Sequence, residues 1–296
     1  MTDADPAATE PGEDAAAADE ASGPSGDVPE GVASAEPETD SAPEGPEADG
    51  SPGDRVVAES LRRSFGDLTV LSGVSFSAAP GTVNCFVGPN GSGKTTLLRI
   101  VAGLLAPTGG RVDVGDATGR VVGYLPQSPS FRPQFTLRET LGFYEALAGV
   151  DIDPQVVLAR VGLDAVADRR VGELSGGMTR LFGIAQATVG DPPVLVLDEP
   201  SSGLDPTMTE HVGTVIRELA DDGHTVLLAT HDLETVDRVA DTVLVLDDGV
   251  VQVADTPEAL RRETDAETLT RAVAQYLVGE AGGLTVRTGS REGDDE

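Results

Sequence analysis

One segment of the chain combines glycines, a lysine and a threonine at the spacing that binds phosphate groups. It fits the pattern G-x-x-x-x-G-K-[ST] without a mismatch and comprises Gly88, Pro89, Asn90, Gly91, Ser92, Gly93, Lys94 and Thr95, with Thr96 following. Glycines let backbone N–H groups turn toward phosphate oxygens, and a helix that starts there adds partial positive charge. Lys94 can reach the β- and γ-phosphates, and the Thr95 hydroxyl can bind Mg²⁺. The segment predicts a site for a nucleoside triphosphate.

A second segment carries two adjacent carboxylates, Asp198 and Glu199, directly after the apolar run 194–197. A buried parallel strand would deliver both acids to the carboxyl edge of a sheet, where ligands of α/β proteins bind. Asp198 would hold Mg²⁺ through its water shell, and Glu199 would orient or deprotonate the attacking water. Paired acids are usually only solvated, but the phosphate-binding pattern upstream favours the catalytic interpretation.

His231 follows another apolar run, residues 226–229, and is expected at the same edge of the sheet. A histidine there can hydrogen-bond the γ-phosphate and hold the carboxylate that orients water. The chain has two other histidines, His211 and His224, for which we expect structural roles.

Strands and helices must alternate along the chain to position these groups. Apolar periodicity predicts strands at 56–64, 70–78, 82–87, 111–114, 121–125, 194–197, 225–229 and 242–247. It predicts helices at 94–105, 136–148, 154–161, 176–190, 206–221, 232–239 and 257–279. This order indicates an α/β fold with a P-loop core and a mainly parallel sheet, preceded by an antiparallel β subdomain.

The composition is strongly acidic and nearly free of lysine. The formal net charge is −31, which argues against nucleic-acid binding because that requires a basic surface. Of the 20 basic residues only Lys94 is a lysine, so position 94 is expected to need what arginine cannot supply. Such compositions resemble proteins of salt-loving archaea, and we therefore expect a halophilic protein whose charges are screened by concentrated salt.

A third motif, Leu174 to Met178, opens a predicted helix upstream of the two carboxylates. Together with the other motifs it resembles the ATP-binding cassette (ABC) family of ATPases, over about residues 55–255. The resemblance implies that Ser175, Gly176 and Gly177 bind the γ-phosphate of an ATP held by another subunit. A hydroxyl and glycine N–H groups at a helix start can bind an anion. The family usually has glutamine where Met178 stands.

Three further positions match the family. Gln127, after Tyr124, Leu125 and Pro126, matches the residue that reaches Mg²⁺ and the attacking water and couples to the membrane partner. Phe65 matches the aromatic side chain that stacks on adenine. Asp205 closes the segment Ser202-Gly203-Leu204-Asp205, which matches the loop that touches the opposite subunit.

Composition and the resemblance together divide the chain into three parts. Residues 1–54 contain sixteen acidic and no basic side chains and are predicted to be a disordered acidic tail. A passive solubilising extension is favoured over a docking arm or a mis-chosen start codon. Residues 55–256 are predicted to form the ATPase domain, with an inserted helical subdomain at about 128–190. Residues 257–296 are predicted to be a helical extension with a frayed end.

Two functions fit these motifs. The favoured one is a transporter subunit that hydrolyses Mg·ATP as a homodimer or heterodimer and drives a separate integral membrane permease. The alternative is a soluble ABC ATPase of metal-cluster or complex assembly. The Gln127 loop and residues 136–144 look like the branch paired with ABC-2-type export permeases, in which subunits of copper-processing systems are similar. We expect a cytoplasmic protein attached to the inner face of the membrane through its permease.

Deleting residues 1–54 is expected to leave ATP hydrolysis and folding essentially unchanged, because no motif and no apolar periodicity lies there. Steady-state hydrolysis and the unfolding midpoint of the truncated and full-length chains should be compared in concentrated KCl. A large loss of activity in the truncated chain would show that the tail belongs to the catalytic machinery.

Overall fold

A computed structural model describes residues 55–115 and 121–278. The predicted acidic tail and the last residues of the predicted C-terminal extension lie outside them. The first sheet is antiparallel and has the strand order β2-β1-β4. Its strands are β1 (Val56–Phe65), β2 (Leu68–Ala78) and β4 (Gly109–Asp113). A tight turn at Gly66, whose φ is +59°, joins β1 to β2 and pairs Phe65 with Leu68.

The second sheet has six strands in the order β5-β6-β7-β3-β8-β9, and all its neighbours are parallel except β8 and β9. The strands are β3 (Val83–Val87), β5 (Val122–Leu125), β6 (Val194–Asp198), β7 (Thr225–Ala229), β8 (Thr242–Asp247) and β9 (Val250–Asp255). The strands β3, β6 and β7 are buried throughout, as expected for parallel strands covered on both faces. The predicted α/β fold with a mainly parallel sheet is confirmed.

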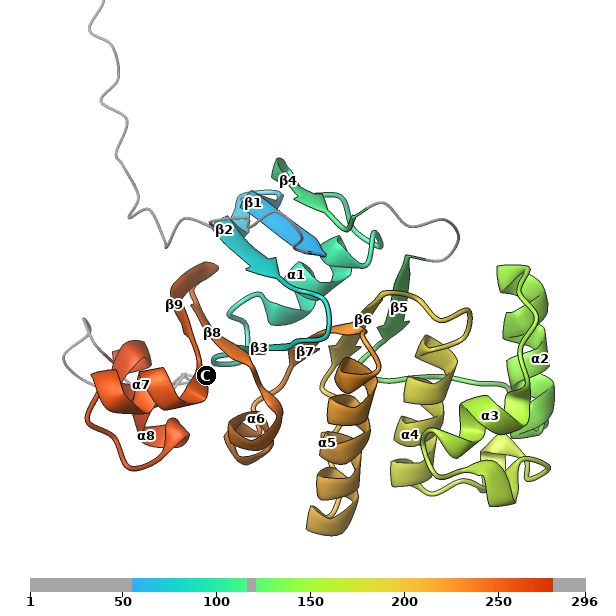
Figure 1. Cartoon of the computed structure of the whole chain (residues 1–296). Helices are drawn as coiled ribbons and strands as arrows, with labels where there is room; N and C mark the ends of the chain where they lie inside the picture. Colours follow the sequence, from blue (N-terminus) through green and yellow to red (C-terminus); the bar gives the residue numbers. More distant parts are fainter. Residues whose placement is uncertain (1–54, 116–120, 279–296) are drawn as a thin grey trace, which may run out of the picture. The chain divides into compact units, whose positions relative to one another are not determined.

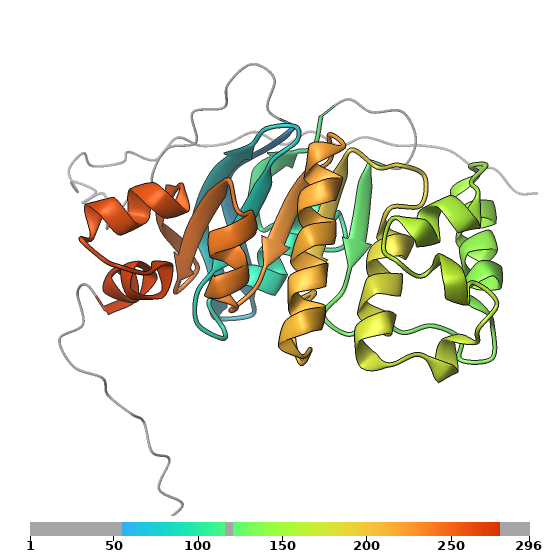
Figure 2. The same cartoon turned by 60° about the horizontal axis from the view of Figure 1, so that its bottom comes forward.

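Alternate residues of each central strand pack into different layers. In β6, Leu195 and Leu197 join the core under α4 (Gly176–Ala187), α5 (Pro206–Asp221) and α6 (Leu233–Val239). Val194 and Val196 join the core shared by α1 (Lys94–Val101) and the antiparallel sheet. Figures 1 and 2 show these helices on opposite faces of the six-stranded sheet.

Further helices lie at the two ends of this sheet (Figure 1). Between β5 and α4 the chain forms α2 (Leu137–Ala148), α3 (Pro154–Ala159) and two 3₁₀ turns, and α2 and α3 contact α4. Thr136 and Glu139 form a reciprocal capping box that starts α2. At the other end, α7 (Pro257–Glu263) contacts α8 (Leu269–Val278), which packs on α6 and β8. The domain boundaries proposed from the sequence stay predictions.

The structure differs from the sequence-based elements at several points. The helix predicted at 94–105 ends at Val101, because Gly103 takes a φ of +69° and turns the chain out of the helix. The helix predicted at 176–190 ends at Ala187. The helix predicted at 257–279 is broken, with Asp265 at a φ of +51° between α7 and α8. The apolar periodicity of the sequence did not predict strand β9. No helix within the described ranges has the length and apolarity needed to cross a membrane.

Gly123 lies where β5 meets the end of α4, and a methyl group there would overlap the Ala187 carbonyl oxygen. We expect Gly123→Ala to lower the free energy of unfolding by about 1–3 kcal/mol through overpacking. Gly142, in α2, has no atom closer than 4.0 Å to an added Cβ. Gly142→Ala is therefore a matched control that should gain about 1 kcal/mol from helix propensity. Chemical denaturation of both variants measures this, and equal stability of Gly123→Ala and the wild type would contradict the close approach.

Candidate nucleotide site

The loop between β3 and α1 comes close to neighbouring backbone at its two ends. At Gly88 φ is +151°, and a Cβ would overlap the carbonyl oxygen of Leu246 in β8. At Gly93 φ is +105°, and a Cβ would lie 2.7 Å from the Leu71 side chain. Gly93 also precedes α1 and provides no side-chain cap. The first N–H groups of the helix therefore face the loop without a capping side chain to accept their hydrogen bonds. These are the conditions for an anion site.

Lys94 is the first residue of α1, is 7% exposed, and directs its side chain back to this loop. Its Nζ donates hydrogen bonds to the carbonyl oxygens of Gly88 at 2.8 Å and Pro89 at 2.9 Å. Burial lowers the pKa of Lys94 from its ordinary value, and the charges of Glu199 and Asp198 oppose that shift. Two neutral carbonyl oxygens thus accept the hydrogen bonds of the ammonium group. Charged phosphate oxygens in their place would accept stronger hydrogen bonds.

Thr95 and Asp198 join α1 to the end of β6. The Thr95 hydroxyl donates to Asp198 Oδ1 at 3.1 Å, and the other carboxylate oxygen, Oδ2, is buried without a partner. Burial raises the pKa of Asp198, and the Thr95 hydrogen bond opposes that shift. A buried carboxylate oxygen with no partner beside a hydroxyl provides oxygen ligands of the kind that Mg²⁺ requires. The residues therefore fit the ion.

Glu199 has an unusual backbone conformation and a histidine partner. Its φ is +52°, which few residues other than glycine adopt, and its N–H donates to the Ala229 carbonyl at 2.8 Å. The Nδ1 of His231 lies 2.8 Å from Glu199 Oε2. An ionised carboxylate can only accept, so the imidazole is the donor in this pair. His231 is largely exposed, whereas Glu199 is buried, so the ring joins the carboxylate to the open side of the site.

A cavity of about 530 Å³ brings half of the predicted residues together. Its walls include Asn90, Gly91, Gly93, Lys94, Thr95, Thr96, Gln127, Asp198 and Glu199. Gly88, Pro89 and Ser92 belong to the same loop but do not line it, and the buried Ser92 hydroxyl has no partner.

Two apolar residues that sequence reasoning missed, Leu68 and Val70, also line this cavity. Strand β2 begins earlier than predicted, and Leu68 is strongly exposed for a large apolar side chain, which the structure shows and the sequence does not. Phe65 lies outside the lining. Its ring is half exposed, and the guanidinium of Arg63 lies 4.4 Å from its centre, so one face is already covered.

The residues predicted to serve a second subunit lie outside this cavity. Ser175 caps α4 by accepting a hydrogen bond from the Met178 N–H at 3.3 Å. Asp205 caps α5 by accepting one from the Met208 N–H at 3.0 Å. A Cβ on Gly177 would lie 2.9 Å from the Met208 side chain, so the starts of α4 and α5 adjoin each other. Gly176 has no atom within 4 Å of an added Cβ.

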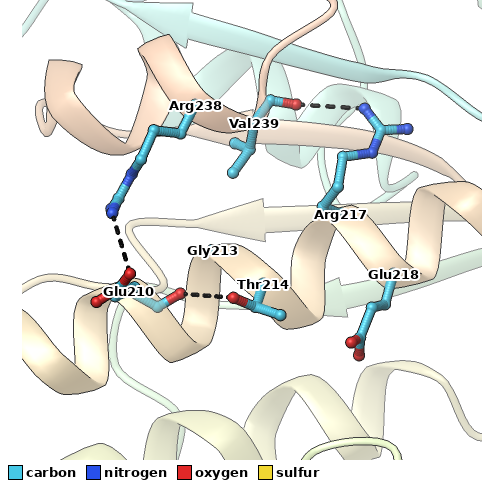
Figure 3. Close-up of a pocket in the computed structure, with 7 residues that line it drawn as sticks. All are labelled: Glu210, Gly213, Thr214, Arg217, Glu218, Arg238 and Val239. Atoms are coloured by element: carbon cyan, nitrogen blue, oxygen red, sulfur yellow. Dashed lines mark hydrogen bonds and ion pairs between the residues drawn. The ribbon is translucent and has the colours of Figure 1, made fainter.

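A smaller cavity of about 260 Å³ lies between α5 and α6 and contains none of the predicted site residues (Figure 3). Its arginines have protein partners. Arg238 approaches Glu210 at 4.0 Å, and Arg217 donates to the Val239 carbonyl and forms ion pairs with Asp221 and Asp241. Because of these pairings we assign the nucleotide to the larger cavity.

Comparison with known proteins supports the same assignment. The family model described as ABC transporter matches residues 71–202. The Nod factor export ATP-binding protein I of Paraburkholderia xenovorans is 37% identical over 220 residues, covering 69% of this chain and 72% of that protein. The protein of the same name from Bradyrhizobium diazoefficiens is 38% identical over 213 residues, covering 68% and 70%.

Solved structures agree with this result. An ATP-binding subunit of an ABC transporter matches with a TM-score of 0.67 at 25% identity, covering 75% of this chain and 99% of that one. The ADP conformation of an ATP-binding cassette of an ABC transporter matches with a TM-score of 0.66 at 27% identity, covering 77% and 100%. The chain therefore belongs to the family of ABC transporter ATP-binding proteins, and it is an ATPase.

Proposed function

We propose that the chain is the nucleotide-binding subunit of an ABC exporter, in which two cassettes close around two Mg·ATP and drive a separate membrane permease. The observation that carries this proposal is the line of contacts from Thr95 through Asp198 to the adjacent Glu199 and His231. The hydroxyl and both carboxylates belong to residues that line one cavity with a buried lysine, and the imidazole reaches this cavity through its contact with Glu199. Such an arrangement suits phosphoryl transfer to water, which depends chiefly on positioning and charge stabilisation.

The buried side chains divide the work between binding and catalysis. Lys94 would exchange its two carbonyl partners for β- and γ-phosphate oxygens. Glu199 would accept a proton from the attacking water or orient it, and His231 would keep the carboxylate in place and face the γ-phosphate. The positive φ of Glu199 contributes to this geometry, because it turns the side chain away from the direction that β6 would otherwise set.

Three oxygen-bearing side chains would hold the metal. Thr95 offers its hydroxyl, Asp198 its unpartnered Oδ2 and Gln127 its side-chain amide at the cavity wall. When bound, Mg²⁺ neutralises charge that develops on the transferring phosphate. Phe65, through its uncovered face, and the apolar wall of Leu68 and Val70 are proposed to receive the adenine.

The dimer is proposed because the chain carries two phosphate-binding sets that do not share a cavity. Ser175, Gly176, Gly177 and Asp205 lie outside the wall formed by the P-loop. The Ser175 hydroxyl accepts from the Met178 N–H and still has its own proton to donate to a phosphate oxygen. Two copies arranged head to tail would complete each site with the second set from the other copy, and a related ABC ATPase could replace one copy.

The permease partner and the direction of transport are proposed from the relatives. The proteins named above are ATP-binding proteins of Nod factor export. In such a system the chain would be attached to the inner face of the membrane through its permease. The charge of −31 supports the proposal of a salt-adapted protein, so the assays below use concentrated KCl.

Glu199→Gln is expected to bind Mg·ATP but to hydrolyse it at least about a hundredfold more slowly, because the amide keeps the shape of the carboxylate and loses its basicity. In sedimentation, the variant should shift from monomer to dimer on addition of Mg·ATP. Glu210→Gln, an exposed position on α5, is the matched control and should hydrolyse ATP like the wild type. Turnover of Glu199→Gln within a few-fold of the wild type would rule out the proposed role, and a monomer at saturating Mg·ATP would rule out the closed dimer.

Lys94→Arg is expected to abolish most ATP binding although it conserves charge. A guanidinium is planar and forked, whereas the loop holds a compact ammonium between two carbonyls 2.8 and 2.9 Å away. Misplacement by about 1 Å can cost about a hundredfold in rate. Equilibrium titration of ATP and steady-state hydrolysis measure the effect, with Arg111→Lys on exposed β4 as the reverse exchange. Wild-type affinity and turnover in Lys94→Arg would refute the requirement for lysine.

A further inference from the structure

Helix α4 lies against the loop that follows β5, because its surface there has no side chain at Gly183. A Cβ on Gly183 would meet the side chains of Leu125 and Pro129. Arg180 precedes Gly183 by three residues, and residues at i and i+3 share one face of a helix. The guanidinium of Arg180 is thereby directed toward the same loop.

The loop residue that Arg180 contacts is Gln127. Nη1 of Arg180 donates a hydrogen bond to the main-chain carbonyl of Gln127. Within residues 55–115 and 121–278, this is the one hydrogen bond that Gln127 makes. The backbone of Gln127 is therefore held from α4, and the same residue lines the nucleotide cavity.

The charge of Arg180 also interacts with the carboxylates of the nucleotide site. Burial lowers the pKa of Arg180, and the carboxylates of Glu199 and then Asp198 oppose that shift. The guanidinium is therefore within electrostatic reach of both acids, although its hydrogen bond is to a neutral carbonyl.

We propose that Arg180 is a positioning residue for ATP hydrolysis, which acts by holding the Gln127 backbone so that the Gln127 amide points into the nucleotide cavity. This inference rests on the proposed function. The Arg180 side chain connects α4, whose N-terminus is capped by Ser175, to the wall of the chain's own nucleotide site. Loss of Arg180 should leave the phosphate loop intact and displace Gln127.

The test uses the full-length chain with Arg180→Met, which keeps much of the side-chain length and removes the donor and the charge. We expect kcat to fall about tenfold or more, the half-saturating Mg²⁺ concentration to rise several-fold, and the affinity for metal-free ATP to stay within about twofold of the wild type. Arg238→Met is the matched control, because Arg238 is also a helix arginine with protein partners but lies at the cavity between α5 and α6 (Figure 3).

A double-mutant cycle with Gln127→Ala decides whether Arg180 acts through Gln127. If it does, Arg180→Met in the Gln127→Ala background should change kcat by no more than about twofold. If the two effects multiply, or if Arg238→Met lowers kcat as much as Arg180→Met does, the proposal is wrong. The unfolding midpoint reports whether each variant folds. If Arg180→Met does not fold, Arg180→Lys takes its place in the same cycle. A slow Glu199→Gln variant together with multiplying effects would refute this inference and leave the proposed function standing.

Discussion

The parallel pairing of four neighbouring strands, β5, β6, β7 and β3, is the constraint on which the rest of the structure depends. Parallel strands end at one edge, so the groups that follow them meet there: Gln127 after β5, Asp198 and Glu199 from β6, His231 after β7 and Lys94 after β3. The pairing is stable because both faces of the central strands are apolar and covered. Each fully buried Val or Leu side chain contributes about 1.5–3 kcal/mol.

Groups that are costly to bury lie at this edge. Lys94, Asp198 and Glu199 are all nearly inaccessible, and each would be unfavourable as an isolated charge. Their opposite charges partly offset one another, and the hydrogen bonds from Thr95 and His231 satisfy one oxygen on each carboxylate. The unpartnered Oδ2 of Asp198 and the positive φ of Glu199 remain unfavourable for the free energy of folding. A bound nucleotide with its metal would satisfy the first, and the second sets the direction in which the Glu199 carboxylate points.

Helix starts account for much of the remaining chemistry. The N-terminus of α1 faces the phosphate loop, while those of α4 and α5 adjoin each other through Gly177 and Met208. Ser175 and Asp205 stabilise their own helices as caps, each by accepting one backbone N–H. The same two residues therefore have a local structural role that does not depend on any partner. Their proposed contact with a second subunit adds to this role.

The sequence by itself determined the family, the α/β fold with its mainly parallel sheet, and the ATPase activity, because each depends on short-range patterns. A phosphate loop needs glycines and a lysine within eight residues, and a buried strand needs only a continuous apolar run. The roles of the individual site residues stay predictions, although the cavity gathers half of them.

Tertiary structure decided what depends on residues distant in the sequence. It added Leu68 and Val70 to the cavity wall and left Phe65 beyond it, because the antiparallel sheet sets where that wall runs. It also brought Arg180 to Gln127, 53 positions earlier in the chain. An arginine on a helix has no local signal for its partner, since its long side chain can reach solvent or a neighbour equally well. Only the close packing of α4, permitted by a glycine, selected the carbonyl that it binds.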